Sequence, residues 1–427
     1  MNQQQCSNLN SESAAAPAAE RSARVAIIGA GPIGLETALA AVQAGHSVRI
    51  YERTNVAANV NSWGHITLFT PFAINASTAG QAILAAHNEP LPSPEALLTG
   101  HEFRDQYLLP LSRIQALADC IHAHCEVVAV GRPHLWKADD VADSKRANDG
   151  FQLLIRDHSS ERSHEFVSTA DYVCDCSGTY PHHNWMGAGG IPAIGEQDVL
   201  CEQDYRIPDI LGRDCERFAN RATMIVGSGY SAATAVVSLH EMSQRFPQTQ
   251  AIWLTRTDRR PPLSDIADDT LPERRQLVRR ANALARADAA ACRWYPSSRV
   301  HQLQRNTAGQ IAVRLSTANE SPRTELVDQV IVQTGYRPDR SLYEELQVHE
   351  CYASQGPIKL AATLMASQSQ DCMTQPTSGE EVLLNPEPQL FIIGSKSYGR
   401  DSRFLLRTGL NQIEMVMNLI ADREEQR

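Results

Sequence analysis

Three glycines near the N-terminus have the spacing of a phosphate-binding turn. Gly29, Gly31 and Gly34 form G-x-G-x-x-G, directly after the apolar run 25–28 and directly before the Ala-rich segment 35–44. In such a strand–turn–helix unit the first glycine allows a tight turn and the second lets a pyrophosphate approach the backbone. The third brings helix and strand close together, while the helix N-terminus faces the anionic phosphates. We therefore expect a dinucleotide at this turn.

An acid follows at the place where the ribose of a dinucleotide is recognised. Glu52 closes the next apolar run, 47–52, and an acid roughly 20 residues beyond the turn suits the ribose hydroxyls of an adenine dinucleotide. An isolated glycine motif is weak evidence. Here strand, turn, helix, second strand and acid all occur in order, so the signal is strong.

The same pattern recurs in the second half of the chain. Gly227 and Gly229 hold the first two glycine positions after the apolar run 222–226, and Ala232 takes the third, which this fingerprint tolerates. Residues 234–242 continue as a predicted helix. The chain therefore has a second predicted dinucleotide site.

The strand after this second turn ends in an arginine rather than an acid. Arg256 closes the run 251–256, and Arg259 and Arg260 lie just beyond it. A guanidinium can bind the 2′-phosphate that distinguishes NADPH from NADH. The second site therefore favours NADPH.

Each half closes with a small antiparallel insertion and a strand that ends in glycine. The expected strands are 126–130, 151–156 and 165–169 before Gly178, and 299–304, 311–315 and 324–326 before Gly335. A glycine at a strand end lets the backbone pack against a bound dinucleotide. We predict an α/β fold with two Rossmann-like dinucleotide-binding domains, each with an antiparallel β insertion. Two such domains exclude a dehydrogenase with one cofactor and a separate substrate domain.

Composition and charge narrow the class of partner. Of the 427 residues, 42% are hydrophobic and 21% charged, and the net charge is −10, whereas a protein that binds the nucleic-acid backbone needs a basic surface. No apolar run reaches the ~18 residues of a membrane span. The first 24 residues lack the apolar core of a signal peptide. We expect no nucleic acid and no membrane as partners, a disordered leader and a cytoplasmic location.

The cysteines favour neither a dithiol nor a metal. Ten cysteines lie at irregular spacings without a C-x-x-C motif. Cys174 and Cys176 are two residues apart on a predicted buried strand, where their side chains stand too far apart for an easy bridge, so we interpret them as inert thiols. The two cysteines and two histidines of residues 120–125 crowd one short segment, which cannot surround a metal tetrahedrally. We predict no metal site.

The layout over residues 24–421 resembles the flavoproteins with two dinucleotide-binding domains, which include flavin-dependent monooxygenases and pyridine-nucleotide disulfide reductases. The resemblance implies FAD at the first glycine turn and NADPH at the second. It also implies the domain boundaries: a disordered leader over 1–23, an FAD-binding domain over 24–212 and 327–427, and an inserted NADPH-binding domain over 213–326.

The resemblance extends to the C-terminal part of the chain. Residues 389–394 resemble the last strand of the FAD domain, whose end approaches the flavin ribityl chain, and Ser395 stands where many relatives have an aspartate. A helix from Arg407 would point its N-terminus at the isoalloxazine, where it stabilises negative charge.

Motifs and resemblance together give the residues that we expect to contact the cofactors, and no catalytic residue is named. For FAD they are Gly29, Gly31, Pro32, Ile33, Gly34, Glu52, Arg53, Trp63, Val128, Gly178, Gly394 and Ser395, and for NADPH they are Gly227, Gly229, Tyr230, Ser231, Arg256 and Gly335.

Two departures bear on the subfamily. The disulfide reductases carry a pair of cysteines facing the flavin, and the monooxygenases that accept soft nucleophiles carry an F-x-G-x-x-x-H linker; this chain has neither motif. The leading interpretation is an NADPH-dependent FAD oxidoreductase of the monooxygenase type, with O2 and a small substrate oxygenated at nitrogen or sulfur. The alternative is an NADPH-dependent reductase of a disulfide, a quinone or a protein. A non-catalytic flavin sensor would need a degenerate second turn, and a homodimer is left open.

Three further segments have both a functional and a structural interpretation. Residues 61–72 are expected to form either an aromatic pocket beside the flavin or a loop that packs on the core. Residues 271–286 are expected to form a basic amphipathic helix whose charged face lies in solvent. In the polar loop 396–407 we expect at least one side chain to contact a ligand. The candidates named in these segments are Trp63, His65, Phe69, Phe72, Lys396, Tyr398, Arg400 and Arg403.

Overall fold

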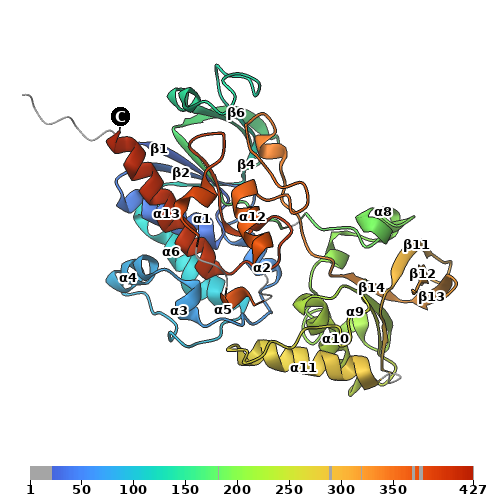
Figure 1. Ribbon diagram of the computed structural model, residues 1–427. Coiled ribbons are helices and arrows are strands. Elements are labelled where there is room, and N and C mark those ends of the chain that lie inside the picture. Colours follow the sequence, from blue (N-terminus) through green and yellow to red (C-terminus); the bar gives the residue numbers. More distant parts are fainter. Residues whose placement is uncertain are drawn as a thin grey trace, which may run out of the picture.

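The structure, a computed structural model, describes residues 22–180, 182–287, 291–318, 320–367, 371–374 and 378–426. These residues form two α/β units, which Figure 1 shows as two lobes joined by crossings of the chain. Most of the predicted leader, residues 1–21, lies outside the described residues.

The first unit is built on a parallel sheet of five strands in the order β15-β7-β1-β2-β3. Its strands are β1 (Arg24–Ile28), β2 (Ser47–Glu52), β3 (Ile121–Ala123), β7 (Tyr172–Asp175) and β15 (Leu390–Ile392). An antiparallel sheet of three strands covers one face, and its strands are β4 (Cys125–Gly131), β5 (Phe151–Asp157) and β6 (His164–Ala170).

Helices cover the other face of this sheet. They are α1 (Pro32–Gln43), α2 (Ala58–Ser62), α3 (Phe72–Asn75), α4 (Thr78–Ala86), α5 (Gly100–Phe103), the π-helical turn η1 (Arg104–Leu108), α6 (Leu109–Arg113), α7 (Gln115–Ala118), α12 (Ile358–Ala366) and α13 (Leu406–Glu425). Short 3-10 turns complete the unit at η2 (Ser144–Asn148), η5 (Ser341–Tyr343), η6 (Cys372–Thr374), η7 (Glu380–Leu383) and η8 (Gly394–Tyr398).

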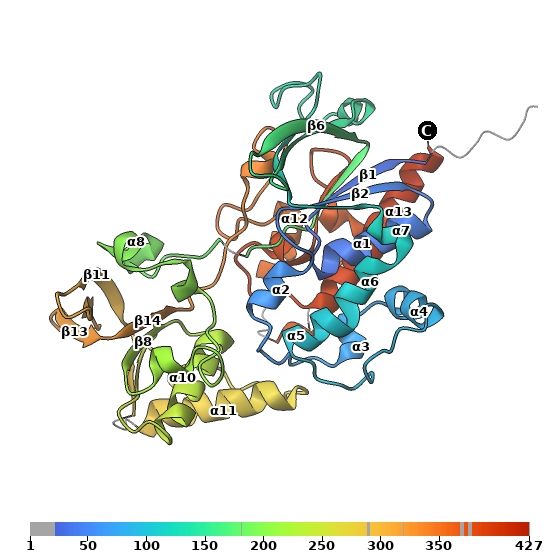
Figure 2. The ribbon, with the colours of Figure 1, turned by 180° about the vertical axis from the view of Figure 1, so that it is seen from behind.

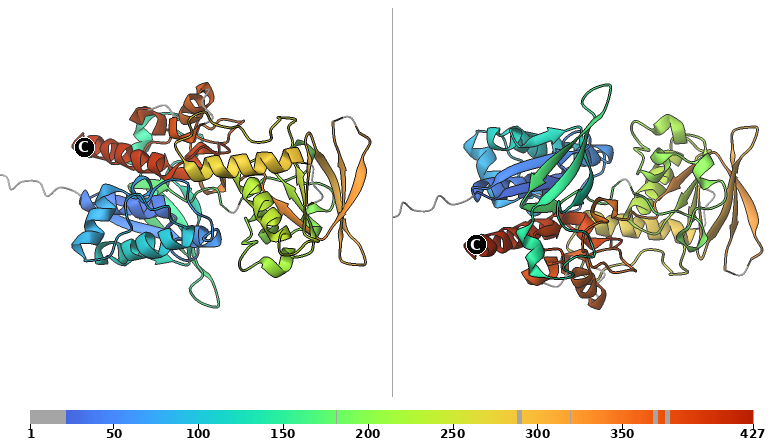
Figure 3. Two further views of the ribbon diagram at one scale, coloured as in Figure 1. Left: turned by 90° about the horizontal axis from the view of Figure 1, so that it is seen from below. Right: turned by 90° about the horizontal axis from the view of Figure 1, so that it is seen from above.

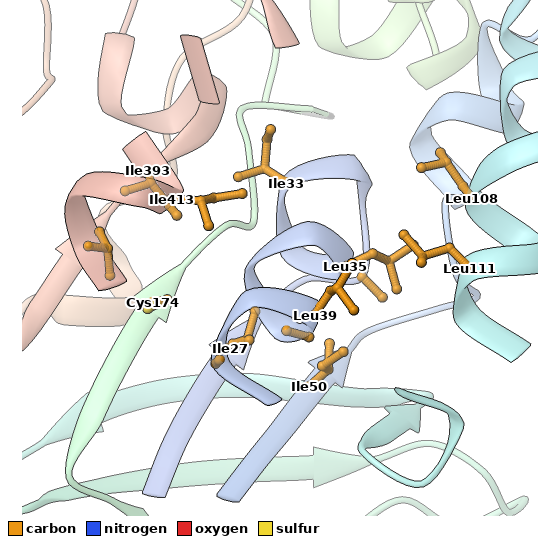
Figure 4. Packing of buried hydrophobic residues seen from close by; sticks show 14 of the residues in the cluster. Ile27, Ile33, Leu35, Leu39, Ile50, Leu108, Leu111, Cys174, Ile393 and Ile413 are labelled. Carbon is orange, nitrogen blue, oxygen red and sulfur yellow. The ribbon is translucent and has the colours of Figure 1, made fainter. Parts of the chain in front are cut away.

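The period of two along β1 explains why both faces of the sheet are apolar. Val25 and Ile27 belong to the cluster on the helix side, whereas Ala26 and Ile28 belong to the cluster under the antiparallel sheet. A parallel strand buried on both faces reads as a continuous apolar run. Figure 4 shows the helix side, where Leu35 and Leu39 of α1 lie over the sheet between the side chains of α6 and α13.

The second unit repeats this plan with a parallel sheet in the order β10-β9-β8-β14. Its strands are β8 (Ala222–Val226), β9 (Gln250–Leu254), β10 (Cys292–Tyr295) and β14 (Gln329–Val332), with an antiparallel sheet of β11 (Arg299–Arg305), β12 (Ile311–Ser316) and β13 (Arg323–Val327). The remaining helices and turns are η3 (Ala188–Gly190), α8 (Glu196–Val199), η4 (Glu202–Tyr205), α9 (Cys215–Phe218), α10 (Tyr230–Ser243) and α11 (Pro272–Ala287).

The chain crosses between the two units at paired segments. The backbone N–H of Asn184 donates to Gly335 O at 2.9 Å, and that of Arg337 donates to His182 O at 2.8 Å. One crossing follows β7 and the other follows β14, so the second unit is inserted between β7 and β15 of the first. Figure 2 shows both crossings from behind, and Figure 3 shows the two units side by side along the molecule.

The predicted elements are found, with two instructive shifts. Helices α1 and α10 begin at Pro32 and Tyr230, directly at the glycine turns, whereas the apolar pattern becomes continuous only a few residues later. The basic helix α11 is not simply a solvated face, because Arg274 in it is only 1% exposed. Among the described residues, no helix is long and apolar enough to span a membrane.

Candidate dinucleotide sites

In the first glycine turn each glycine has a separate steric reason. Gly29 has a φ of +97°, and a Cβ on it would lie 3.1 Å from Cys176 O. A Cβ on Gly34 would lie 1.9 Å from Gly29 O, so α1 and β1 could not approach as they do. At Gly31, by contrast, a Cβ would meet no atom within 4 Å. The backbone of Gly31 therefore faces open space, which is what the approach of a pyrophosphate requires.

The N-terminus of α1 is prepared for an anion. Gly31 is the N-cap of this 12-residue helix, no side chain caps it, Pro32 follows, and the first turn contains no acidic residue. The first backbone N–H groups of a helix have no partner within it, and they carry the positive end of the helix dipole. These groups are therefore available to a phosphate.

Glu52 forms hydrogen bonds to the first glycine turn, and it also lines the cavity beside that turn. Its Oε2 accepts a hydrogen bond from the backbone N–H of Ala30 at 2.9 Å, and its Oε1 accepts from the N–H of Thr54 at 2.8 Å. The carboxylate thus holds the glycine turn in place.

A cavity of about 100 Å³ lies beside this acid. It brings together Gly29, Glu52, Arg53 and Gly178 of the predicted contacts. It is also lined by Ile28, Tyr51, Asn59, Glu126, Val127, Ser177, Tyr180, His182, Asp339 and Leu342. Neighbouring Val127 lines the cavity where Val128 was expected, because a β-bulge shifts the register of β4 between Val127 and Ala129.

Two cavity residues from the chain crossings, His182 and Asp339, were not among the predicted contacts, although the sequence places His182 in a turn near the crossing between the domains. His182 Nε2 lies 3.5 Å from Asp339 Oδ2, and burial holds the pKa of His182 below its usual value. Each residue follows a strand that ends in glycine, and this position was the available signal. Their pairing depends on the two crossings lying side by side, which the sequence does not reveal.

Other predicted contacts lie around the turn rather than in this cavity. Ile33 packs on the C-terminal part of the unit, since a Cβ on Gly394 would lie 3.4 Å from its Cγ1. Ser395 Oγ would be 3.3 Å from a Cβ on Gly178, so the ends of β7 and β15 meet here. Trp63 packs against Gly100, where a Cβ would lie 2.6 Å from its ring.

The second glycine turn has the same steric logic. Gly227 has a φ of +147°, and its Cβ would lie 2.2 Å from Gln333 O, whereas a Cβ on Gly229 would meet nothing within 4 Å. Gly229 is the N-cap of the 14-residue helix α10, again without a side-chain cap. Tyr230 begins this helix and Ser231 is exposed. The turn is therefore as open to a phosphate as the first.

The arginines beyond β9 differ in what they contact. Arg259 donates to Pro262 O and to Ser264 Oγ within its own loop, and the Arg260 guanidinium lies 5.6 Å from the centre of the Trp294 ring. Arg256 is exposed, and no described residue forms a hydrogen bond or an ion pair with its side chain. Its guanidinium is thus available to an anionic ligand.

The two units touch close to the second turn. The rings of Phe69 and Tyr230 meet edge to face at 5.7 Å, and Arg274 of α11 donates to Asp371 Oδ1 and to Cys372 Sγ, each at 3.0 Å. The loop after α2 therefore faces the second unit through Phe69. Phe72 does not share this role, because it is buried in the core against Tyr107.

His65 lies at the same contact. Its Nε2 is buried without a hydrogen-bond partner among the described residues. Burial holds the pKa of His65 below its usual value, while Asp209 raises it. The buried position therefore favours the neutral imidazole.

Burial favours the protonated form of the two thiols at the end of β7, those of Cys174 within the strand and Cys176 just after it. Burial raises the pKa of Cys174 to about 12 and that of Cys176 well above its usual value. Cys176 Sγ lies 3.7 Å from Thr37 Oγ1 of α1, inside the packing of the first unit. Nine cysteines belong to the described residues, and none of them forms a disulfide there. In the same part of the chain no cluster of His, Cys, Asp and Glu is arranged to hold a metal ion.

Comparison with known proteins agrees with this geometry. Residues 2–62, which include the first glycine turn and Glu52, match the pyridine nucleotide-disulphide oxidoreductase family. No curated protein matches the sequence.

Solved structures share the fold over nearly the whole chain at low sequence identity. The bacillithiol disulfide reductase of Bacillus cereus is 16% identical, with a TM-score of 0.64 over 94% of this chain and 100% of its own. The ornithine N-hydroxylase of Kutzneria sp. is 17% identical, with a TM-score of 0.56 over 94% and 100%. The flavin-containing monooxygenase of Stenotrophomonas maltophilia is 17% identical, with a TM-score of 0.55 over 94% and 99%.

These findings confirm the predicted resemblance and fold class: the chain has the fold of the FAD- and NAD(P)H-dependent oxidoreductases with two dinucleotide-binding domains, and its N-terminal segment matches a family of such enzymes.

Proposed function

We propose that the protein is an NADPH-dependent FAD oxidoreductase of the monooxygenase type, which uses O2 to oxygenate a small substrate at nitrogen or sulfur. The observation that carries this proposal is the presence of two open glycine turns in one chain, at Gly31 and Gly229. Each turn begins a helix whose N-terminus is uncapped. Such a chain can hold a hydride donor and a hydride acceptor together.

The residues beyond the turns support the order of the two cofactors. Glu52 repels a 2′-phosphate at the first site and suits FAD, whereas unpaired Arg256 attracts one at the second and suits NADPH. When bound, FAD supplies hydride acceptance and the activation of O2. The protein's own groups bind and orient the two dinucleotides, and Phe69 and Tyr230 bring the units into contact.

The state of the thiols supports oxygenation over thiol exchange. A disulfide reductase needs a thiolate as the attacking group. Cys174 lies beside β1 and Cys176 lies against the first glycine turn, and burial raises the pKa of both thiols. They therefore do not suit that role.

One other cysteine favours a second candidate function, reduction of a disulfide. Cys372 lines a cavity of about 320 Å³ beside the first turns of α13, and its Sγ accepts a hydrogen bond from Arg274. Burial raises the pKa of this thiol as well, but unlike Cys174 and Cys176 it has a guanidinium beside it that favours the thiolate. Replacing Cys372 with serine would abolish a disulfide reductase activity and leave an oxygenase activity in place.

The proposal assigns one cofactor to each unit. The first unit is the FAD-binding part and the second unit is the NADPH-binding part. The boundaries expected from the resemblance, 213–326 for the NADPH-binding part, are too narrow, because the second unit also holds η3, α8 and η4 before them and β14 after them. The partners are a small-molecule substrate and O2, and the location is the cytoplasm.

Rapid mixing tests the proposal. The FAD-loaded protein is reduced with NADPH without oxygen, and it is then mixed with oxygenated buffer while flavin absorbance is followed. A transient near-ultraviolet band before the oxidised spectrum returns supports a monooxygenase. Very slow reoxidation supports the reductase, and failure of NADPH to bleach the flavin refutes both.

A further inference from the structure

A lysine is buried behind the wall of the first dinucleotide site. Lys396 in η8 is 1% exposed, and its Nζ donates to Asp175 Oδ2 at 2.5 Å and to Ser177 Oγ at 3.0 Å. The ring centre of Tyr343 lies 5.1 Å from the same nitrogen. These contacts remove the ammonium group from water, which is costly unless each contact is well formed.

Asp175 completes a closed network at the end of β7. It is 1% exposed, and its Oδ1 accepts hydrogen bonds from Ser177 N at 3.1 Å and from Ser177 Oγ at 2.6 Å. The Ser177 hydroxyl thus donates to Asp175 and accepts from Lys396. Two strand ends, those of β7 and β15, are held together by one ion pair and one hydroxyl.

This network supports residues that face the first glycine turn. A Cβ on Gly29 would lie 3.1 Å from Ser177 Cα, so the turn rests directly on this residue. Ser177 and Gly178 also line the cavity beside Glu52. Burial is the main cause of the lowered pKa of His182 on the wall of that cavity. The pKa of Asp339 is raised by burial but lowered overall, mainly by its hydrogen bonds with Ser341, and the charge of Lys396 lowers both pKa values further.

We propose that Lys396 is a positioning residue for the dinucleotide of the first unit. Through Asp175 and Ser177 it fixes the turn at Ser177–Gly178 against Gly29, and it ties that turn to Gly394–Ser395, the two residues that directly precede Lys396 in the chain. Loss of this tie lets both turns move and weakens cofactor binding. The inference rests on the proposed function only for the binding of FAD at this turn, and it is independent of the reaction that follows.

Titration of the apoprotein with FAD tests this role, with flavin fluorescence reporting the dissociation constant and thermal unfolding reporting the stability of the apoprotein. Lys396→Met removes the tie and leaves Asp175 buried without its counterion. We expect the dissociation constant for FAD to rise by about tenfold or more, which corresponds to the loss of a charge-assisted hydrogen bond. We also expect Tm to fall. Lys359→Met is the matched control, because Lys359 is exposed on α12.

A double variant separates positioning from simple charge neutralisation. Asp175→Asn with Lys396→Met removes both charges, so the Tm of the apoprotein returns toward that of the wild type. The tie is still absent, so FAD binding stays about tenfold weaker. Wild-type FAD affinity in either K396M or the double variant would overturn the proposal, and the double variant decides if K396M does not fold.

The same titration distinguishes this inference from the proposed function. If the wild type binds FAD but NADPH does not reduce it, the proposed function fails and the role of Lys396 stands. If the wild type takes up no FAD, the cofactor assignment fails, and the inference fails with it.

Discussion

The two glycine turns have the same backbone and differ in what lies beyond them. Gly31 and Gly229 both face open space, and both precede an uncapped helix. At the first turn the strand-end acid Glu52 is bonded to the turn itself, through the N–H of Ala30. At the second, Arg256 is exposed and unpaired among the described residues. The glycines decide where a phosphate approaches, and the strand-end side chain decides which dinucleotide it belongs to.

The third position of the motif gives the sharpest contrast between the turns. Gly34→Ala places a Cβ 1.9 Å from Gly29 O, so the backbone must move. We expect FAD binding to be lost and the free energy of unfolding to fall by about 1–3 kcal/mol or more. FAD titration and urea unfolding measure these effects.

The second turn supplies the control, because it carries Ala232 at the equivalent place, fully buried. Ala232→Gly should cost at most about 1 kcal/mol, the difference in helix propensity. A Gly34→Ala variant that keeps its FAD affinity would show that close approach of helix and strand is not needed at the first turn.

Arg256 tests the other half of the contrast. In Arg256→Ala we expect the KM for NADPH to rise about tenfold or more while that for NADH changes little, because only the 2′-phosphate loses its charged partner. Flavin reduction rates measured against both nucleotides give this ratio. Arg259→Ala is the matched control, since Arg259 is bound within its own loop. An unchanged preference in Arg256→Ala would contradict the NADPH assignment.

Replacement of Glu52 should weaken cofactor binding at the first glycine turn and leave binding at the second unchanged. Glu52→Gln keeps one acceptor oxygen and replaces the other with a donor. We expect the dissociation constant for FAD to rise about fivefold, corresponding to about 1 kcal/mol for one hydrogen bond, with the KM for NADPH unchanged. Thr54→Val removes a single hydroxyl contact to the same carboxylate and serves as the control. An equal effect of Glu52→Gln on both nucleotides would mean that it acts on the whole molecule.

Local patterns were sufficient to predict the repeated fold. The apolar runs before Gly29 and Gly227 are strands buried on both faces, so they stand out from the sequence without knowledge of their neighbours. The glycines follow from sterics within the same short unit. For these reasons the strand–turn–helix–strand unit at each glycine turn and both antiparallel insertions were predicted, whereas the edge strand β10 was not.

Contacts between distant segments could not be predicted in this way. Lys396 and Asp175 are 221 residues apart in the chain, and no local sequence pattern in either segment indicates that they form a contact. Arg274 reads as one of many charges on a basic helix, yet it is buried against Asp269 and Asp371. Val127 was missed by one position because a bulge shifts the register of its strand. Each case depends on which elements meet, and this information is not local.

The contact between the two units gives the last and smallest expected effect, a dependence on pH. Burial holds the pKa of His65 below its usual value, although Asp209 and Asp214 raise it and Arg213 lowers it. The unfolded chain therefore takes up the proton first, so His65 makes the protein less stable as the pH falls from about 6.5 toward the lowered pKa. Above that range it contributes no dependence of stability on pH.

His65→Gln removes this contribution, and urea unfolding at a series of pH values should give a shallower loss of stability on the acid side than in the wild type. His46→Gln is the control, because His46 lies in the loop after α1, away from the second unit. If the slopes of wild type and His65→Gln are equal, the imidazole is in water, and the loop after α2 does not hold the second turn against the first unit.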